Sequence, residues 1–240
     1  MDLKYKRILL KFSGEVLMGR ADFGWDINVL TQVAEQVKSI RALGVEVAIV
    51  VGGGNVFRGA QVQSDKIQRS TADQMGMMAT VMNAIALRDV FESMSLTTRV
   101  MSAQAMASVT EGFSANAAQK ALSAGDVVVF AGGTGNPFFT TDTAAALRGI
   151  EVNADVVLKA TKVDGIYEAD PFKNPDAKRY SKLSYTQVIQ KNLQVMDLAA
   201  FALCRDHAMP IRVFDMLKTG AIERILQGED EGTLVTIGDE

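Results

Sequence analysis

The 240-residue sequence is poor in the residues that build disulfides, zinc sites and histidine-based catalysis. A single cysteine, Cys204, forms no disulfide within the chain, which is typical of proteins from a reducing compartment. One histidine and one cysteine exclude a conventional zinc site made of these residues. A catalytic system of the Ser-His-Asp or Cys-His kind would depend on His207 alone.

The sequence also lacks long apolar runs and an excess of positive charge. No run approaches the roughly 20 residues that a transmembrane helix needs. The apolar stretch at residues 8–10 is too short for the core of a signal peptide. The net charge of −3 differs from the basic charge of most nucleic-acid binders. We therefore expect a soluble, cytoplasmic protein that binds neither membranes nor nucleic acid.

Short apolar, β-branched runs alternate with helical patterns, which is typical of the α/β class with a mostly parallel central sheet. Strands are predicted at residues 7–12, 45–51, 97–101, 126–130, 155–159, 211–214 and 233–237. Helices are predicted at residues 27–43, 73–94, 116–123, 197–206 and 221–227, and from residue 143. No repeat or linker divides the chain, so we expect a single domain over residues 1–240.

The common phosphate-binding motifs are missing. Residues 14–19 have the glycine spacing of a Walker A motif, but Arg20 and Ala21 stand where its lysine and hydroxyl residue belong. Residues 52–55 and 133–135 lack the third glycine of a dinucleotide fingerprint. Neither a P-loop enzyme nor a nicotinamide dehydrogenase is supported.

Four predicted buried strands nevertheless end in glycine-bearing or lysine–threonine turns, at residues 11–14, 52–55, 132–136 and 159–165. Glycine lets peptide N–H groups approach an anion closely and adopts the positive φ that anion-binding nests require. One such turn by itself more often only reverses the chain. Because parallel strands end at one edge of a sheet, four together predict a phosphate site there.

Basic residues accompany these turns, as phosphoryl transfer requires. They are Lys11, Arg58, Lys159 and Lys162. Each lysine or arginine could instead be a solvated surface charge. Lys11 differs because it ends the apolar run at residues 8–10, where an ammonium needs a partner or ligand to offset its desolvation.

The motifs at residues 11–14, 52–55 and 162–167 resemble the amino-acid kinase superfamily. Within it, residues 133–142 (GTGNPFFTTD) closely resemble the bacterial uridylate (UMP) kinases, as do residues 55–59, 73–77 and 195–201. The similarity extends from about residue 5 to residue 236. It implies a three-layer α/β/α sandwich, transfer of the γ-phosphate of ATP to UMP with Mg²⁺ in pyrimidine nucleotide biosynthesis, and a homohexamer.

The resemblance also implies which residues bind each nucleotide. The ATP-binding residues would be Lys11, Phe12, Ser13, Gly14, Gly54 and Arg58 around the phosphates, and Thr161, Tyr167 and Asp170 around adenine and ribose. The UMP-binding residues would be Gly53, Asp73, Thr134, Gly135, Asn136, Pro137, Phe138, Phe139, Thr140 and Thr141. A carboxylate such as Asp73 accepts hydrogen bonds from ribose hydroxyls. Phe138 and Phe139 would pack on the pyrimidine or fill the core.

For catalysis, we expect Lys11 and Lys162 to neutralise charge on the transferred group. Asp197 would orient a lysine or help to hold magnesium, or would serve only as a helix N-cap. No covalent nucleophile is needed, because an oxygen of the UMP phosphate attacks directly.

The resemblance further implies GTP and UTP as effectors, with contacts at Arg88, Asp89 and Arg99, although an Arg-Asp pair on a helix is more often plain surface. The helix at residues 73–94 is apolar on most of its circumference, so core or a second subunit should cover it.

Two other functions remain open. The first is a relative that binds an anion or nucleotide without turnover, and Lys11, Lys162 and Asp197 argue against it. The second is a kinase of another acceptor, such as an amino acid, carbamate or isopentenyl phosphate, and residues 133–142 argue against that.

Overall fold

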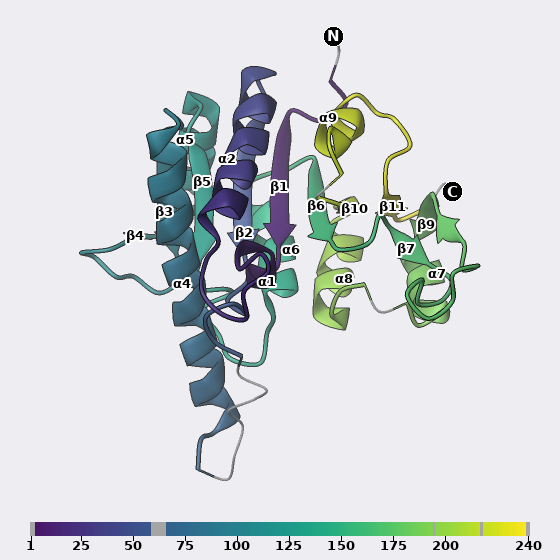
Figure 1. The fold of residues 1–240 in the computed structure, drawn as a ribbon, viewed down its shortest axis with the longest axis horizontal. Helices are drawn as coiled ribbons and strands as arrows, with labels where there is room; N and C mark the ends of the chain where they lie inside the picture. Colours follow the sequence, from purple (N-terminus) through teal and green to yellow (C-terminus); the bar gives the residue numbers. More distant parts are fainter. Residues whose placement is uncertain (1–2, 59–65, 194, 217, 239–240) are drawn as a thin grey trace.

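The structure, a computed structural model, describes residues 3–58, 66–193, 195–216 and 218–238. Its centre is a nine-stranded sheet in the order β4-β3-β5-β2-β1-β6-β10-β11-β9 (Figure 1). The strands are β1 (Arg7–Phe12), β2 (Glu46–Val51), β3 (Thr98–Ser102), β4 (Glu111–Gly112), β5 (Val127–Ala131), β6 (Val156–Thr161), β9 (Lys182–Ser184), β10 (Ile211–Asp215) and β11 (Thr233–Thr236). All neighbours are parallel except β10 and β11. The predicted mostly parallel sheet is confirmed.

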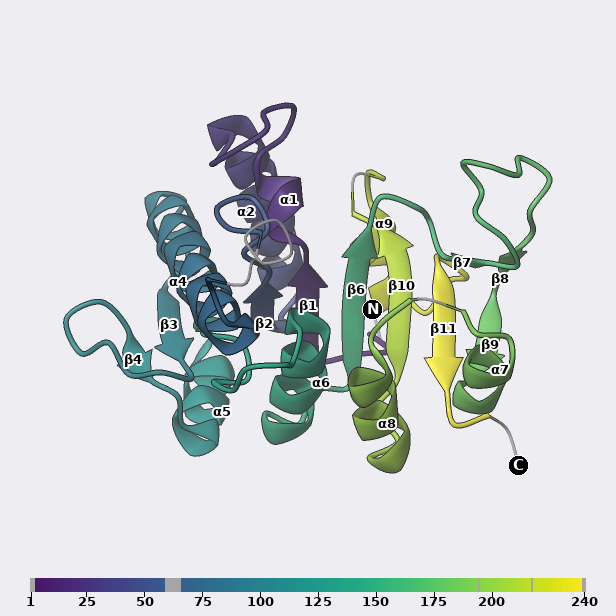
Figure 2. The ribbon, with the colours of Figure 1, turned by 90° about the horizontal axis from the view of Figure 1, so that it is seen from below.

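Helices cover both faces of the sheet, which gives the expected three layers (Figure 2). One layer contains α1 (Gly14–Leu17), α2 (Ile27–Ala42), α4 (Arg69–Ser93) and α9 (Ala221–Leu226). The other contains α5 (Ala115–Ala124), α6 (Thr141–Glu151), α7 (Tyr185–Gln190) and α8 (Leu198–Asp206). A separate antiparallel pair, β7 (Ile166–Tyr167) and β8 (Arg179–Tyr180), lies outside the main sheet.

The pleat of the central strands divides their side chains between the two layers. In β1, Ile8, Leu10 and Phe12 pack into the core beneath α2 and α4. Leu9 packs into the opposite core, with residues of α5, α6 and α8. Lys11 has the same parity as Leu9 and is therefore directed toward the α6 layer. The strand thus brings an ammonium group to the carboxyl end of the sheet on one particular face.

Helix boundaries follow capping chemistry where the sequence provides it. Asp26 and Asp197 cap α2 and α8, with side chains that accept from the peptide N–H groups of Asn28 and Ala200. Helix α4 begins at Arg69, four residues before the predicted start, and its N-cap Gln68 makes no side-chain capping bond. The start of α4 was missed because this sequence signal is absent. Gly59, the last residue of one motif, lies outside the described residues.

Candidate functional site

The four strands that carry the candidate loops, β5, β2, β1 and β6, are neighbours at the centre of the sheet. All three pairings among them are parallel, so their carboxyl ends meet at one edge (Figure 1). The prediction that the loops share an edge is confirmed. This edge is where open α/β sheets bind ligands.

A buried charge cluster lies at this edge. Lys11 and Lys159 are register partners on β1 and β6. Their Nζ atoms lie 2.6 Å from Asp142 Oδ1 and 2.6 Å from Asp142 Oδ2, respectively. Asp142 lies in the first turn of α6, and Lys159 also donates to the carbonyl of Val195. One carboxylate therefore holds two cations at the carboxyl ends of adjacent strands.

The cluster shifts the titration of its members. Burial raises the pKa of Asp142, but the Lys11 and Lys159 ammonium groups together lower it by more than burial raises it. The net pKa therefore lies below the ordinary value. Burial lowers the pKa of Lys159, and the Asp142 carboxylate offsets only part of that effect. Asp142 is thus held as a carboxylate, and the net effect of burial on Lys159 is a lowered pKa.

Asp197 joins the N-termini of α8 and α6. Besides capping α8, its carboxylate accepts from the hydroxyls of Thr140 and Thr143, the latter at 2.9 Å. The negative charge of Asp197 also acts on Lys159. The predicted capping of this helix by Asp197 is confirmed, and Asp197 also contacts the first turn of α6, which carries Asp142.

Two different physical reasons explain why the candidate loops have glycine and no larger residue. Gly132, Gly133 and Gly135 have φ of +74°, +57° and +83°, which favours glycine. Gly14 and Gly53 lack positive φ, and what excludes a side chain there is close packing: a Cβ on Gly53 would lie 2.8 Å from the carbonyl oxygen of Gly76 in α4. Among the glycines of the four candidate loops, positive φ therefore occurs at these three positions after β5 and at Gly165 (φ +159°) after β6.

A pocket of about 340 Å³, here called the α4 pocket, contains most of the residues implied for UMP. Gly53, Asp73, Thr134, Asn136, Phe139, Thr140 and Thr141 line it, together with Met77 and Thr80 of α4. Phe138 and Phe139 are 66% and 51% exposed, so they do not fill the core. The peptide N–H of Phe138 (φ +72°) donates to Asp73 Oδ2 at 2.8 Å, and Gly135, Pro137 and Phe138 do not line the pocket.

A second pocket of about 570 Å³, the β6 pocket, contains the three residues implied for adenine and ribose. Thr161, Tyr167 and Asp170 line it, with Lys159 of the charge cluster. The Tyr167 hydroxyl donates to Asp164 at 2.5 Å, and Asp170 accepts from the peptide N–H of Phe172. Because Lys159 both lines this pocket and contacts Asp142, the β6 pocket opens onto the charge cluster.

The remaining residues implied for phosphate binding lie around the turns after β1 and β2. Phe12 is fully buried, and Ser13 caps the short α1 by accepting from the peptide N–H of Glu15. Arg58 donates to the carbonyl of Gly54 at 3.1 Å and pairs with Glu15 at 3.3 Å. These residues therefore border the same edge as Lys11.

Lys162 lies in the turn after β6 and is exposed, with no hydrogen bond or ion pair to another described residue. Lys159, like Lys11, lies at the end of a buried strand with most of its side chain covered. The sequence argument singled out such a buried lysine only at Lys11. The signal for Lys159 was its place at the end of an apolar strand, the same signal that singled out Lys11. Asp142 carried no signal of its own beyond its place at the end of the GTGNPFFTTD run.

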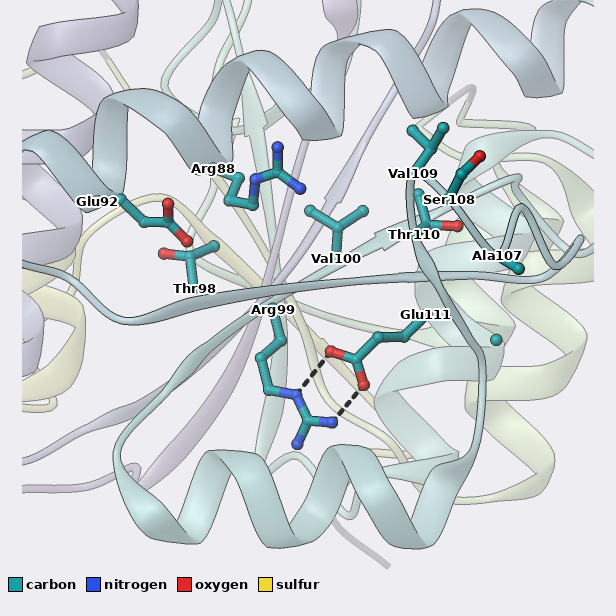
Figure 3. A pocket seen from close by; sticks show the side chains of 11 residues that line it. Arg88, Glu92, Thr98, Arg99, Val100, Ala107, Ser108, Val109, Thr110 and Glu111 are labelled. Atoms are coloured by element: carbon teal, nitrogen blue, oxygen red, sulfur yellow. Dashed lines mark hydrogen bonds and ion pairs between the residues drawn. The ribbon is translucent and has the colours of Figure 1, made fainter.

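A third pocket of about 710 Å³, the β3 pocket, is lined by residues of α4, β3 and β4 and contains two of the three implied effector contacts (Figure 3). Arg88 of α4 and Arg99 of β3 line it, and Arg99 is paired with Glu111. Asp89 is exposed, pairs with Arg88 and does not line the pocket. The Glu111 carboxylate accepting from Arg99 raises the pKa of Arg99 and lowers that of Glu111.

Within the described residues, no three His, Cys, Asp or Glu side chains gather so that they could hold a metal ion. Likewise, none of the described helices has the length and apolar character that crossing a membrane requires.

Comparison with known proteins identifies the family of the chain. The sequence model of the amino acid kinase family matches residues 6–215. A uridylate kinase from Hydrogenovibrio crunogenus is 65% identical over 235 residues, covering 98% of this chain and 100% of the relative. The crystal structure of UMP kinase from Bacillus anthracis matches with a TM-score of 0.95 at 40% identity, covering 98% of this chain and 97% of that one. UMP kinase from Ureaplasma parvum matches with a TM-score of 0.91 at 35% identity, covering 97% and 99%.

Proposed function

Since the chain belongs to the amino acid kinase family, we propose that it is an enzyme that transfers the γ-phosphate of ATP to UMP and so forms ADP and UDP. The observation that carries this function is the placement of the Lys11–Asp142–Lys159 cluster between two pockets. Lys159 lines the β6 pocket, and the turn that leads into Asp142 lines the α4 pocket. A phosphate chain that extends from one pocket to the other would therefore lie beside the ammonium groups of Lys11 and Lys159.

ATP binds with its adenosine in the β6 pocket, beside Thr161, Tyr167 and Asp170. Its phosphates extend along the turns after β1 and β2, over Ser13, Gly14 and Gly54, toward Arg58. The residues there present peptide N–H groups and cations, which are the groups that bind phosphate.

UMP binds in the α4 pocket. Asp73 accepts from the ribose hydroxyls, in exchange for the peptide N–H of Phe138 that it holds in this structure. The hydroxyls of Thr134, Thr140 and Thr141 donate to the phosphate or the base, and the exposed ring of Phe139 stacks on the pyrimidine.

Transfer proceeds in line and without a covalent enzyme intermediate. An oxygen of the UMP phosphate forms a bond to the γ-phosphorus of ATP, while the bond from that phosphorus to the β,γ-bridging oxygen breaks and its electron pair leaves with ADP. Lys11 stabilises the negative charge on the transferred group, and Lys162, which is exposed in the turn after β6, approaches the phosphates from the solvent side. Asp142 and Asp197 position these groups and do not accept protons from the substrate.

Magnesium fits this site as a companion of the nucleotide. Mg²⁺ is usually held by substrate phosphates, waters and one or two carboxylates, which agrees with the absence of an acidic cluster among the described residues. When bound, it would neutralise charge on the β- and γ-phosphates. Asp197, whose charge acts on Lys159 and whose carboxylate accepts from the hydroxyls of Thr140 and Thr143, is the carboxylate that would hold it.

We further propose that the chain works as one domain in a homohexamer. The nine-stranded sheet takes its strands from residue 7 to residue 236, which supports one domain. Met75, Met78 and Met82 on one face of α4 are 40%, 53% and 46% exposed, and a neighbouring subunit would bury them.

GTP or UTP would act at the β3 pocket, where the guanidinium groups of Arg88 and Arg99 suit a triphosphate. A cytoplasmic location would suit an enzyme of pyrimidine nucleotide biosynthesis.

The test is a coupled assay of ADP release with ATP, millimolar Mg²⁺ and one acceptor at a time: UMP, CMP, dUMP, glutamate or carbamate. We expect turnover with UMP and much slower turnover with the other acceptors. Tight ATP binding without ADP release would support the non-catalytic alternative, and turnover with glutamate or carbamate only would support a different acceptor. Either result would overturn the proposed function.

A further inference from the structure

Two asparagines form a reciprocal pair beneath the phosphate edge. Asn55 follows the glycine triplet after β2, and Asn83 lies in the middle of α4; they are 2% and 0% exposed. Asn83 Nδ2 donates to Asn55 Oδ1 at 2.7 Å, and Asn55 Nδ2 donates to Asn83 Oδ1 at 3.0 Å. The pair therefore joins the loop after β2 to the helix that lines the α4 pocket.

The second N–H of each amide reaches the backbone of a different segment. Asn83 Nδ2 donates to the carbonyl of Gly52 at 2.6 Å, and Asn55 Nδ2 donates to the carbonyl of Gly24 at 2.9 Å. Trp25 Nε1 donates to Asn83 Oδ1 at 2.8 Å. The two carbonyls determine which end of each amide is nitrogen, and all four N–H bonds of the pair are used.

The turn after β1 rests on the same pair. A Cβ on Gly14 would lie 2.4 Å from Asn55 Oδ1, 2.5 Å from the carbonyl oxygen of Gly52 and 3.0 Å from Asn83 Nδ2. A Cβ on Gly52 would in turn lie 3.0 Å from the backbone nitrogen of Gly14. The two phosphate-side turns are thus in contact through atoms that the amide pair holds.

We propose that Asn55 and Asn83 are positioning residues, which fix the turns after β1 and β2 against α4 and thereby set where the transferred phosphate lies; this role rests on the proposed function. Apolar side chains of similar volume would fill the space without desolvating two amides. The amides add direction, since each donates to one particular carbonyl, at 2.6 Å for Gly52 and 2.9 Å for Gly24. The pair thus connects the ATP-side turns to the helix that carries Asp73 and Met77 of the α4 pocket.

The test replaces Asn83 by alanine and compares it with Gln119→Ala. Gln119 also donates its amide to a backbone carbonyl, that of Glu151 at 2.7 Å, but it joins α5 to α6 away from the two turns. Affinity for MgADP is measured by calorimetry well below the Tm of each variant, together with kcat and KM for ATP. Asn83→Ala should weaken MgADP binding about tenfold and raise KM for ATP with it, whereas Gln119→Ala should change neither.

Trp25, the single tryptophan of the chain, reports whether the pair is broken. Its emission in the free protein should shift in Asn83→Ala and stay unchanged in Gln119→Ala, because only the first substitution removes the acceptor of its N–H. Should Asn83→Ala fail to fold, Asn55→Ser is used for the measurements of MgADP affinity and of KM for ATP. The double variant Asn55→Ala/Asn83→Ala should weaken MgADP binding no more than whichever of Asn55→Ala and Asn83→Ala has the larger effect alone. That result is expected for residues that act as one unit.

A lower Tm with unchanged MgADP affinity and unchanged KM for ATP would make the pair merely structural and would overturn the inference. Additive losses in the double variant would overturn it as well. The MgADP measurement needs no turnover, so it decides this inference even if the wild-type protein fails to phosphorylate UMP. Conversely, if the wild-type protein phosphorylates UMP and Asn83→Ala leaves MgADP affinity and KM for ATP unchanged, this inference fails and the proposed function stands.

Discussion

Lys11 and Lys159 stand in register on adjacent parallel strands and share the two oxygens of one carboxylate, Asp142. Two cations on neighbouring strands repel each other, and Asp142 offsets that repulsion. Each lysine is largely buried, with 9% and 12% of its side chain exposed, so the cluster is part of the packed structure at the carboxyl edge of the sheet.

Lys11→Ala is expected to lower kcat by about 10²-fold or more, because it removes a cation from the transferred group. The steady-state assay with ATP and UMP measures it. Lys38→Ala, which removes an exposed lysine of α2, is the control and should leave kcat unchanged. An unchanged kcat in Lys11→Ala would remove Lys11 from the mechanism.

Lys159→Ala and Lys162→Ala should differ in stability. Loss of Lys159 removes a buried partner of Asp142 and should cost about 1–3 kcal/mol of unfolding free energy. Lys162 is exposed, so its loss should change stability by no more than about 0.5 kcal/mol while lowering kcat. Urea unfolding and the coupled assay separate the two effects. A normal kcat in Lys162→Ala would assign the second cation of the reaction to Lys159.

Asp73→Asn should raise KM for UMP more than KM for ATP, since it weakens the acceptor for the ribose hydroxyls in the α4 pocket. Asp89→Asn, on the same helix but outside that pocket, serves as the matched control. A larger effect on ATP than on UMP would exchange the two site assignments.

Acidification should destabilise the wild-type protein more steeply than Asp142→Asn. The pKa of Asp142 is lowered in the folded state, so its stabilising contribution is complete above the ordinary aspartate pKa of about 4 and is lost as pH falls through the lower folded value. Urea unfolding of both proteins from neutral pH to about pH 3 measures this. Parallel stability curves over that range would show that Asp142 contributes no pH dependence.

Sequence reasoning found the parts of the fold that have a clear physical signal. Buried strands such as β1 and β2 are continuous apolar runs, and α2 combines an N-cap at Asp26 with helical periodicity. Short elements were missed because two to six residues do not establish a period. Among these are β4, β9 and α7.

The candidate site was found in outline, but its centre was not. Glycine turns and lysines at strand ends predict a phosphate site at the carboxyl edge of the sheet. Which side chains meet across neighbouring strands depends on the strand register, which one sequence does not give. The meeting of Lys11 and Lys159 at Asp142 therefore required the structure. The same holds for Asn55 and Asn83, which are 28 residues apart and carry no sequence signal of pairing.

The sheet ends in very short strands on both sides, β4 with two residues and β9 with three. An edge strand is a template on which a foreign strand can pair, and a short one offers few free N–H and C=O groups. Copies of this chain are therefore poorly suited to join sheet to sheet or to grow into fibres. Contact between copies would instead use side-chain surfaces such as the exposed Met75, Met78 and Met82 of α4, where geometry limits how many copies can meet.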